Sequence, residues 1–458
     1  MKILASFFLL ALTACHPFPE DAWETTTPKK AGFDEAAFAN YLTFMKDPGN
    51  GSETHALVVV KDGKIVTEWY AKDIDPAHRH TLWSASKSVS HAIVGAAWDV
   101  GHFKLTDAVT LPGAPPGLTV SDLLQMSSGI FWREDYVDPM KSTIIPMLYT
   151  RASHADLSSW VLSMGQEYTP GEFFRYSSGD TNVLMKWVRD QLPAAERDDF
   201  PWKKVFEPIG IRSATFEADA QGNWLGSSYL YMTPRDFARF GLLYARGGRW
   251  KNQQILSRDW LKTTLRDLAP SLKRKGAEKR SYANQWHLNL PYADGSGRPY
   301  NDWPEDTILA FGHRGQYLLV VPSLDLVVAR VGADRSYFDD EKGLALLSQS
   351  LKGAKTVHPP LIATSVYASR AARMPTGTGL TTAPTMEELL SYFYAKELCS
   401  CLFVEEMPEA MCLRIQSQPW PASQVDVRHA SREVAVSVGP LTLTSTWVSD
   451  HLGCSQTQ

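Results

Sequence analysis

Apolar, β-branched residues are concentrated in two pairs of short runs that lie far apart in the chain. The first pair, 55–60 and 64–70, flanks Asp62-Gly63, a dipeptide that supplies the positive φ angles of a tight hairpin turn. The second pair occupies 317–331, with a Pro-Ser-Leu-Asp turn in its middle. We therefore expect two β-hairpins separated by most of a large domain.

Helical periodicity fills the sequence between these hairpins. Apolar residues recur at helical spacing in 121–126 and 234–244, and Ser121 and Thr233 are suitable N-cap residues for these helices. Strands at both ends with helices between them predict an α/β (α+β) fold: an antiparallel sheet flanked by helices, with a helical subdomain. A cleft is expected between the sheet and the helical part.

A shift in composition divides the chain into two parts. Residues 357–385 are rich in Ala, Thr, Ser, Pro and Gly without periodicity, which is typical of a linker. We expect one large domain over 20–356 and a small C-terminal β module over 386–458. Within the module, 386–398 has a helical pattern and valines alternate along 425–438.

The N-terminal segment has the organisation of a secretion leader. A basic start at Lys2 is followed by an apolar run, and small residues close the run before Cys15. The run is shorter than the about 20 apolar residues that span a bilayer, so we expect 1–15 to be a cleaved signal peptide. Its Leu-Thr-Ala-Cys ending resembles the bacterial lipobox, which implies lipidation at Cys15, a membrane anchor and a protein facing the periplasm. The alternative is an incidental cysteine in an ordinary leader.

The composition is that of a folded globular protein. Hydrophobic residues make up 44% and charged residues 21% of the 458 residues. The formal net charge is −4, so the chain lacks the basic field that attracts nucleic acid, and we expect no nucleic-acid partner.

The cysteines are distributed unevenly. Apart from Cys15, they are Cys399, Cys401, Cys412 and Cys454. Four clustered cysteines in an exported chain favour two disulfides that hold a small module together, with the pairing left open. Metal binding is the alternative, but the paired Cys-x-x-Cys spacing of zinc sites is missing, so we expect no metal site.

Ser84 and Lys87 form the first candidate for chemistry. The run from Trp83 through Ala97 has helical spacing, and residues three apart lie on the same face of a helix. A serine hydroxyl becomes a nucleophile when a nearby base removes its proton, and a lysine does so where burial or a neighbouring cation lowers its pKa. A lone Ser-x-x-Lys pattern is otherwise an ordinary helix start with an exposed lysine.

Two further segments add to this interpretation. Tyr176 stands in a Ser/Gly-rich loop that leads into a helix expected from Asn182, where a phenol can relay protons. Gly315 lies in a turn just before the second hairpin, and the backbone N–H groups of Gln316 and Ser84 are candidates for an oxyanion hole. Taken singly, a packed aromatic and a glycine turn need no function.

In this order, Ser84-x-x-Lys87, Tyr176-Ser177-Ser178 and His313-Arg314-Gly315 resemble the three motifs of the serine β-lactamase and penicillin-recognising superfamily. The resemblance covers roughly residues 25–355. Several segments look like the branch of class C β-lactamases, family VIII carboxylesterases and 6-aminohexanoate-dimer hydrolases: 123–129, 176–184, 226–240 and 312–332. The resemblance implies Ser84 as nucleophile, Lys87 as general base and Tyr176 as its proton-relay partner, with no metal or organic cofactor.

Two departures from the family pattern bear on the substrate. His313-Arg314-Gly315 stands where β-lactamases and D,D-peptidases have Lys-Thr-Gly, which holds a substrate carboxylate. The resemblance places His313 near Tyr176 and leaves Arg314 either reaching a substrate carboxylate or pointing away. The second motif lacks the asparagine of class C enzymes, for which Asn182 is a substitute.

These features predict hydrolysis of a small-molecule ester or amide through a Ser84 acyl-enzyme. A β-lactamase or D,D-peptidase of the same fold is the near alternative. A non-catalytic module that binds cell wall or another ligand is the alternative from a different class.

Two other polar groups are interpreted as surface or loop residues. His78 and His80 have metal-like spacing but no evident third ligand, and Glu134-Asp135 lacks the paired context of a glycosidase.

Overall fold

The structure is a computed structural model, and it describes residues 18–47, 49, 51–136, 138, 141–335, 338–351, 384–416 and 424–457. The predicted signal peptide and Cys15 lie outside these residues, as does most of the predicted linker. Within the described ranges, no helix combines the length and apolar character needed to cross a bilayer.

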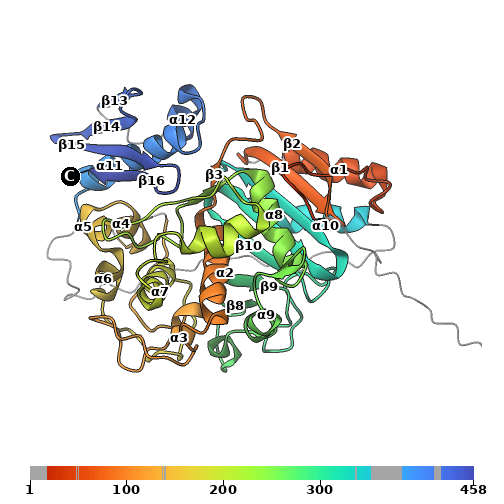
Figure 1. Cartoon of the computed structure of the whole chain (residues 1–458), viewed down its shortest axis with the longest axis horizontal. Helices are drawn as coiled ribbons and strands as arrows, with labels where there is room; N and C mark the ends of the chain where they lie inside the picture. Colours follow the sequence, from red (N-terminus) through yellow and green to blue (C-terminus); the bar gives the residue numbers. More distant parts are fainter. Residues whose placement is uncertain are drawn as a thin grey trace, which may run out of the picture.

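Seven antiparallel strands form the central sheet, in the order β2-β1-β12-β11-β10-β9-β8 (Figure 1). The strands are β1 (Thr54–Lys61), β2 (Lys64–Tyr70), β8 (Tyr282–Ala283), β9 (Trp286–Leu288), β10 (Ile308–Gly312), β11 (Gln316–Val321) and β12 (Leu326–Gly332). Both predicted hairpins are confirmed, and they join where β1 pairs with β12. The sheet is thus assembled from distant segments, as expected.

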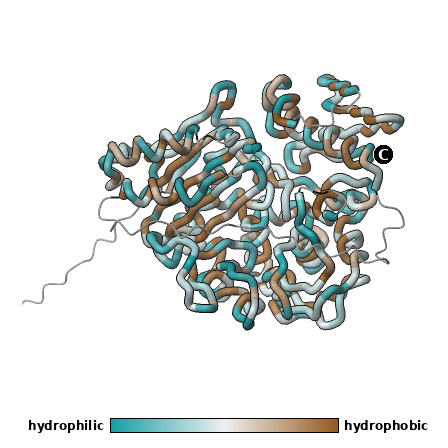
Figure 2. The backbone as a smooth tube through the Cα atoms, turned by 180° about the vertical axis from the view of Figure 1, so that it is seen from behind, coloured by the Kyte–Doolittle hydropathy of each residue, from teal (hydrophilic) through white to brown (hydrophobic). Residues whose placement is uncertain are grey.

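Helices cover both faces of this sheet. One layer contains α1 (Glu35–Lys46) and α10 (Asp340–Ser350), and the other contains α2 (Ser86–Asp99) and α8 (Pro234–Ala245) (Figure 1). Alternate residues of β1 point into the two cores. Leu57 and Val59 belong to the core on the α1 side, and Ala56, Val58 and Val60 belong to the core on the side of α2 and α8. Because both faces are buried at the centre of the sheet, β1, β11 and β12 are nearly continuous apolar segments (Figure 2).

Short helices form the predicted helical subdomain beside the sheet. They are α3 (Val120–Leu124), α4 (Ile144–Leu148), α5 (Arg151–Ala155), α6 (Leu157–Leu162) and α7 (Ser178–Gln191). Thr233 caps α8 as predicted, since its hydroxyl accepts from the Asp236 N–H. The cap predicted for α3 was wrong: Thr119 and Asp122 form a capping box, so the helix begins before Ser121.

Smaller elements connect these layers. They are β3 (His80–Thr81), β4 (Thr215–Phe216), β5 (Leu230–Met232), β6 (Arg249–Trp250), β7 (Gln253–Gln254) and α9 (Arg258–Leu265). Strands β3, β5 and β4 form a three-stranded sheet, and β3 leads directly to Ser84.

The C-terminal segment contains a four-stranded antiparallel sheet, ordered β13-β14-β15-β16, packed on a long helix (Figure 1). Its elements are α11 (Met386–Phe403), α12 (Glu409–Ile415), β13 (Gln424–Arg428), β14 (Glu433–Val438), β15 (Leu441–Ser449) and β16 (Gly453–Thr457). Two disulfides are present, Cys399–Cys454 and Cys401–Cys412. The apolar residues of α11 belong to the same core as those of the large domain, so the predicted domain boundaries stay a prediction.

Loss of Cys399–Cys454 is expected to destabilise the protein more than loss of Cys401–Cys412. The two bonds link residues 55 and 11 positions apart, and a longer closed loop restricts the unfolded chain more, by about 4 against about 3 kcal/mol in a chain-entropy model. Denaturant unfolding of the two double Cys→Ala variants measures the difference. The reverse order would contradict the entropic explanation.

Candidate active site

Ser84 lies in a 3-10 turn, η1 (Trp83–Ala85), that runs directly into α2. Trp83 has a φ angle of 48°, in the left-handed region that bulky residues rarely occupy. This sharp change of direction between β3 and α2 leaves Ser84 partly accessible while Trp83 and Ala85 are buried. The nucleophile candidate therefore sits at the start of a helix, as the Ser-x-x-Lys pattern predicts.

Lys87 is buried and donates to three acceptors. Its side chain is on the first turn of α2 and the residue is 1% exposed. The Nζ atom lies 3.0 Å from Ser84 Oγ, 2.9 Å from Ser178 Oγ and 3.1 Å from the Ser227 carbonyl oxygen. Burial lowers the pKa of Lys87 to about 8, against the opposing effect of the Glu134 charge. A fraction of the amine is therefore neutral near neutral pH and able to accept a proton.

Tyr176 lies directly beside this lysine. The Lys87 Nζ atom is 4.9 Å from the centre of the Tyr176 ring. Tyr282 and Arg280 also lie within 6 Å of this ring, each at 5.9 Å. The ring is half-buried just before α7. The structure therefore brings together the three residues proposed to be catalytic, Ser84, Lys87 and Tyr176.

The carboxylate of Glu134 is connected to Lys87 through Ser178. The Ser178 hydroxyl, which accepts from Lys87, donates to Glu134 Oε1 at 2.7 Å, and the Ser178 N–H donates to Oε2 at 3.0 Å. Trp132 Nε1 and the Tyr136 hydroxyl donate to the same carboxylate at 2.6 and 3.0 Å. Glu134 lies in a loop, as interpreted, but these four donors hold its partly buried carboxylate at the site, on the far side of Ser178 from Lys87.

The third motif, in the turn between β10 and β11, contacts the segment that contains the first motif. A Cβ atom on Gly312 would overlap the carbonyl oxygen of Leu82, so only glycine lets β10 approach the segment that precedes Ser84. The His313 ring lies 5.4 Å from the Trp83 ring and stacks on Tyr136 at 4.9 Å. His313 therefore lies beside the residue that precedes Ser84, while its predicted place near Tyr176 stays a prediction.

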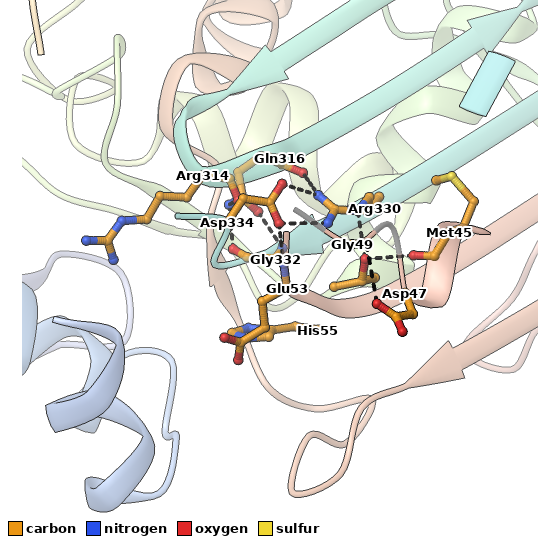
Figure 3. Close-up of polar contacts among 12 residues, drawn as sticks. Met45, Asp47, Gly49, Glu53, His55, Arg314, Gln316, Arg330, Gly332 and Asp334 are labelled. Atoms are coloured by element: carbon orange, nitrogen blue, oxygen red, sulfur yellow. Dashed lines mark hydrogen bonds and ion pairs between the residues drawn. The ribbon is translucent and has the colours of Figure 1, made fainter. Parts of the chain in front are cut away.

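Gln316 and a buried ion pair hold this turn in place (Figure 3). Gln316 Nε2 donates to the carbonyl oxygens of His313, Arg314 and Gly332. The Gln316 side chain thus braces the turn from inside. Its backbone N–H stays our candidate for the oxyanion hole.

Arg330 and Asp334 form the ion pair, with both side chains fully buried. The guanidinium donates to both carboxylate oxygens at 3.0 and 2.8 Å and to the Gly315 carbonyl oxygen at 2.6 Å (Figure 3). Gly315 has a φ angle of 82°, and a Cβ there would overlap the Asp334 carboxylate. Gly315 is therefore a structural requirement of the turn, and its position depends on a charge pair that is well matched and fully desolvated.

Arg314 has the second of its two expected orientations and points away from the reacting atoms. Asn182 is bonded to Ser227, which corrects its predicted substrate-binding role. The left-handed backbone of Arg314, with φ 60°, directs its guanidinium away from the turn to Gln416 Oε1 at 3.0 Å (Figure 3). Both amide atoms of Asn182 bond Ser227, at 3.1 and 3.0 Å. Because the Ser227 carbonyl accepts from Lys87, Asn182 positions an acceptor of the lysine instead of a substrate.

His80 is another correction. The sequence interpretation made it a surface or loop residue, but His80 is a buried residue of β3. The Nε2 atom of His80 lies 3.2 Å from Nδ1 of His55. Among the residues that the structure describes, no group of three or more His, Cys, Asp or Glu side chains is arranged to hold a metal ion.

Sequence reasoning assigned no role to Ser178, Ser227 or Glu134. Ser178 is the third residue of the second motif, so its position in the pattern was a usable signal. Ser227 acts through its carbonyl oxygen, which no side-chain pattern reveals. Glu134 lies between Trp132 and Tyr136, and these two aromatic donors were the sequence signal for its hydrogen bonds.

Comparisons with known proteins agree with this geometry. The Beta-lactamase family model matches residues 43–351, which is more than half of the chain. The 6-aminohexanoate-dimer hydrolase of Paenarthrobacter ureafaciens is 25% identical over 304 residues, which cover 61% of this chain and 72% of that protein.

Two solved structures share the fold. A family VIII carboxylesterase superimposes with a TM-score of 0.53 at 14% identity, over 71% of this chain and 98% of that one. The octameric penicillin-binding protein homologue from Pyrococcus abyssi superimposes with a TM-score of 0.51 at 17% identity, over 70% of this chain and 76% of that one. The chain therefore belongs to the Beta-lactamase family and is a hydrolase of the serine β-lactamase fold.

Proposed function

We propose that this protein cleaves an ester or amide bond of a small molecule through an acyl-enzyme on Ser84. The observation that carries the proposal is the 3.0 Å contact between Ser84 Oγ and the Nζ atom of a buried lysine. A serine hydroxyl this close to a lysine whose pKa is lowered to about 8 has a base within reach of its proton.

Acylation begins when the neutral amine of Lys87 accepts the proton of the Ser84 hydroxyl while Oγ attacks the substrate carbonyl. The backbone N–H groups of Ser84 and Gln316 donate to the oxyanion that forms. The Lys87 ammonium, with Tyr176 as relay, returns a proton to the leaving alcohol or amine. Water then attacks the acyl-enzyme carbonyl while Lys87 accepts a proton from it. The bond between the acyl carbon and Ser84 Oγ breaks, the carboxylic acid leaves, and Lys87 returns the proton to Ser84 Oγ.

Ser178 and Glu134 complete the hydrogen-bond chain behind Lys87. The Ser178 hydroxyl connects the lysine to the carboxylate through contacts of 2.9 and 2.7 Å. The negative charge of Glu134 favours the protonated lysine. Burial is the larger cause of the lowered Lys87 pKa, and Glu134 raises the pH at which the lysine becomes able to act as a base.

The third motif supports esters and linear amides over β-lactams. Where the family places a Lys-Thr pair for the substrate carboxylate, this chain places His313, and Arg314 is directed to Gln416. The relative from Paenarthrobacter is named for an amide hydrolysis and the structural neighbour for ester hydrolysis, which supports the same choice.

We also propose that the protein is a lipoprotein of the bacterial cell envelope, anchored through Cys15 and facing the periplasm. The two disulfides support an oxidising compartment.

When the protein is expressed in a bacterium fed a labelled fatty acid, the wild type should carry the label and partition into the detergent phase on extraction. The Cys15→Ser variant should do neither. Label retained by Cys15→Ser would contradict the anchor.

Ser84→Ala should abolish labelling by a fluorophosphonate probe and lower hydrolysis of p-nitrophenyl esters by at least about 10³-fold, because the acyl-enzyme can no longer form. Mass spectrometry locates the adduct, and Ser121→Ala, on α3, serves as a control. Absence of an adduct on the wild type would favour a non-catalytic binding module. Rapid nitrocefin turnover with inert esters would favour the β-lactamase alternative.

Glu134→Gln should move the acidic limb of the kcat/KM profile to lower pH. Lys87 is active as the neutral amine, so kcat/KM rises with pH through the Lys87 pKa, and removal of the negative charge lowers that pKa. The midpoint is measured from ester hydrolysis across pH 5 to 10, with Glu305→Gln, in an exposed pair with Arg298, as control. A shift to higher pH would contradict this electrostatic role.

A further inference from the structure

A carboxylate of the C-terminal segment is buried against the large domain. Glu397, on α11, is 3% exposed, and a buried carboxylate needs hydrogen-bond donors. Its Oε1 atom accepts from the hydroxyls of Tyr149 and Tyr229, each at 3.2 Å. Both phenols are themselves buried, so one carboxylate oxygen fixes two aromatic side chains of the large domain.

Tyr229 connects this carboxylate to the nucleophile. Its ring lies 5.8 Å from the ring of Trp83, the residue directly before Ser84. The same segment supplies the Ser227 carbonyl that accepts from Lys87 and the Ser228 carbonyl that accepts from Ser86. A displacement of Tyr229 would therefore act on both sides of the Ser84–Lys87 pair.

The neighbouring residue anchors α11 to the same place. Lys396 Nζ lies 2.6 Å from Glu217 Oε2, with side chains 2% and 1% exposed, and 3.9 Å from the centre of the Tyr229 ring. The Cys454 N–H donates to the other oxygen of Glu217 at 3.0 Å. Because breaking a buried ion pair is strongly destabilising, the Lys396–Glu217 pair ties α11 to the large domain.

Two more contacts reach the first and third motifs. Glu405 Oε1 accepts from the N–H and hydroxyl of Thr81, at 2.6 and 2.7 Å, three residues before Ser84. Gln416, after α12, accepts from Arg314. The C-terminal segment thus holds the chain on both sides of the candidate active site.

We propose that Glu397 is a positioning residue of the active site, which acts through Tyr229 and Trp83 to hold Ser84 in its reactive geometry. The inference rests on the proposed function. It makes the C-terminal segment a part of the active site's support, which the family match, ending at residue 351, does not include.

The experiment compares Glu397→Met, Glu397→Gln and Tyr229→Phe in the full chain. Glu397→Met removes the acceptor and should slow fluorophosphonate labelling of Ser84 and lower kcat for a p-nitrophenyl ester about tenfold, with little change in KM, because small displacements of a nucleophile are costly. Glu397→Gln retains an acceptor oxygen and should restore most of the rate. Tyr229→Phe should lower kcat, and adding Glu397→Met to it should cause little further loss.

Glu409→Met, at an exposed position of α12 paired with His429, is the matched control and should label at the wild-type rate. Near-ultraviolet circular dichroism verifies folding, and Tyr229→Phe, which removes a single oxygen, tests the same path if Glu397→Met fails to fold. Wild-type labelling rates in folded Glu397→Met or Tyr229→Phe, or independent multiplicative effects of the two, would overturn the inference. An unlabelled wild type would instead overturn the proposed function, and the inference with it.

Discussion

The candidate active site depends on the burial of one ammonium group. Lys87 has left water for a place where three oxygens accept from its Nζ atom, and this desolvation brings its pKa near the pH at which it must exchange protons. Each of the three oxygens comes from a different part of the chain. The fold must therefore bring α2, α7 and the segment before β5 together before the lysine can be buried at all.

The sheet supplies the rigid side of this arrangement. Its strands β1, β11 and β12 are buried on both faces, and the turn between β10 and β11 brings the third motif next to the segment before Ser84. This turn contains an arginine and a glycine with left-handed backbone angles. The buried Arg330–Asp334 pair stabilises this turn through the bond from Arg330 to the Gly315 carbonyl oxygen.

Features determined by neighbouring residues could be predicted from the sequence. The hairpin at Asp62-Gly63 and the Thr233 cap follow from local backbone preferences, and Ser84 and Lys87 share a helix face because their spacing requires it. Features determined by distant partners could not be predicted. The inward orientation of Glu134 depends on Ser178, the burial of His80 depends on β5, and the direction of Arg314 depends on a left-handed φ angle that nothing adjacent in the sequence announces.

The two disulfides leave α11 from positions two residues apart. Successive residues of a helix are about 100° apart around its axis, so Cys399 and Cys401 point to nearly opposite sides, one bonded to β16 and the other to α12. Covalent bonds on two opposite sides therefore fix the rotation of α11 relative to β16 and α12. Lys396 and Glu397, less than one turn before Cys399, consequently have orientations set by bonds within the C-terminal segment.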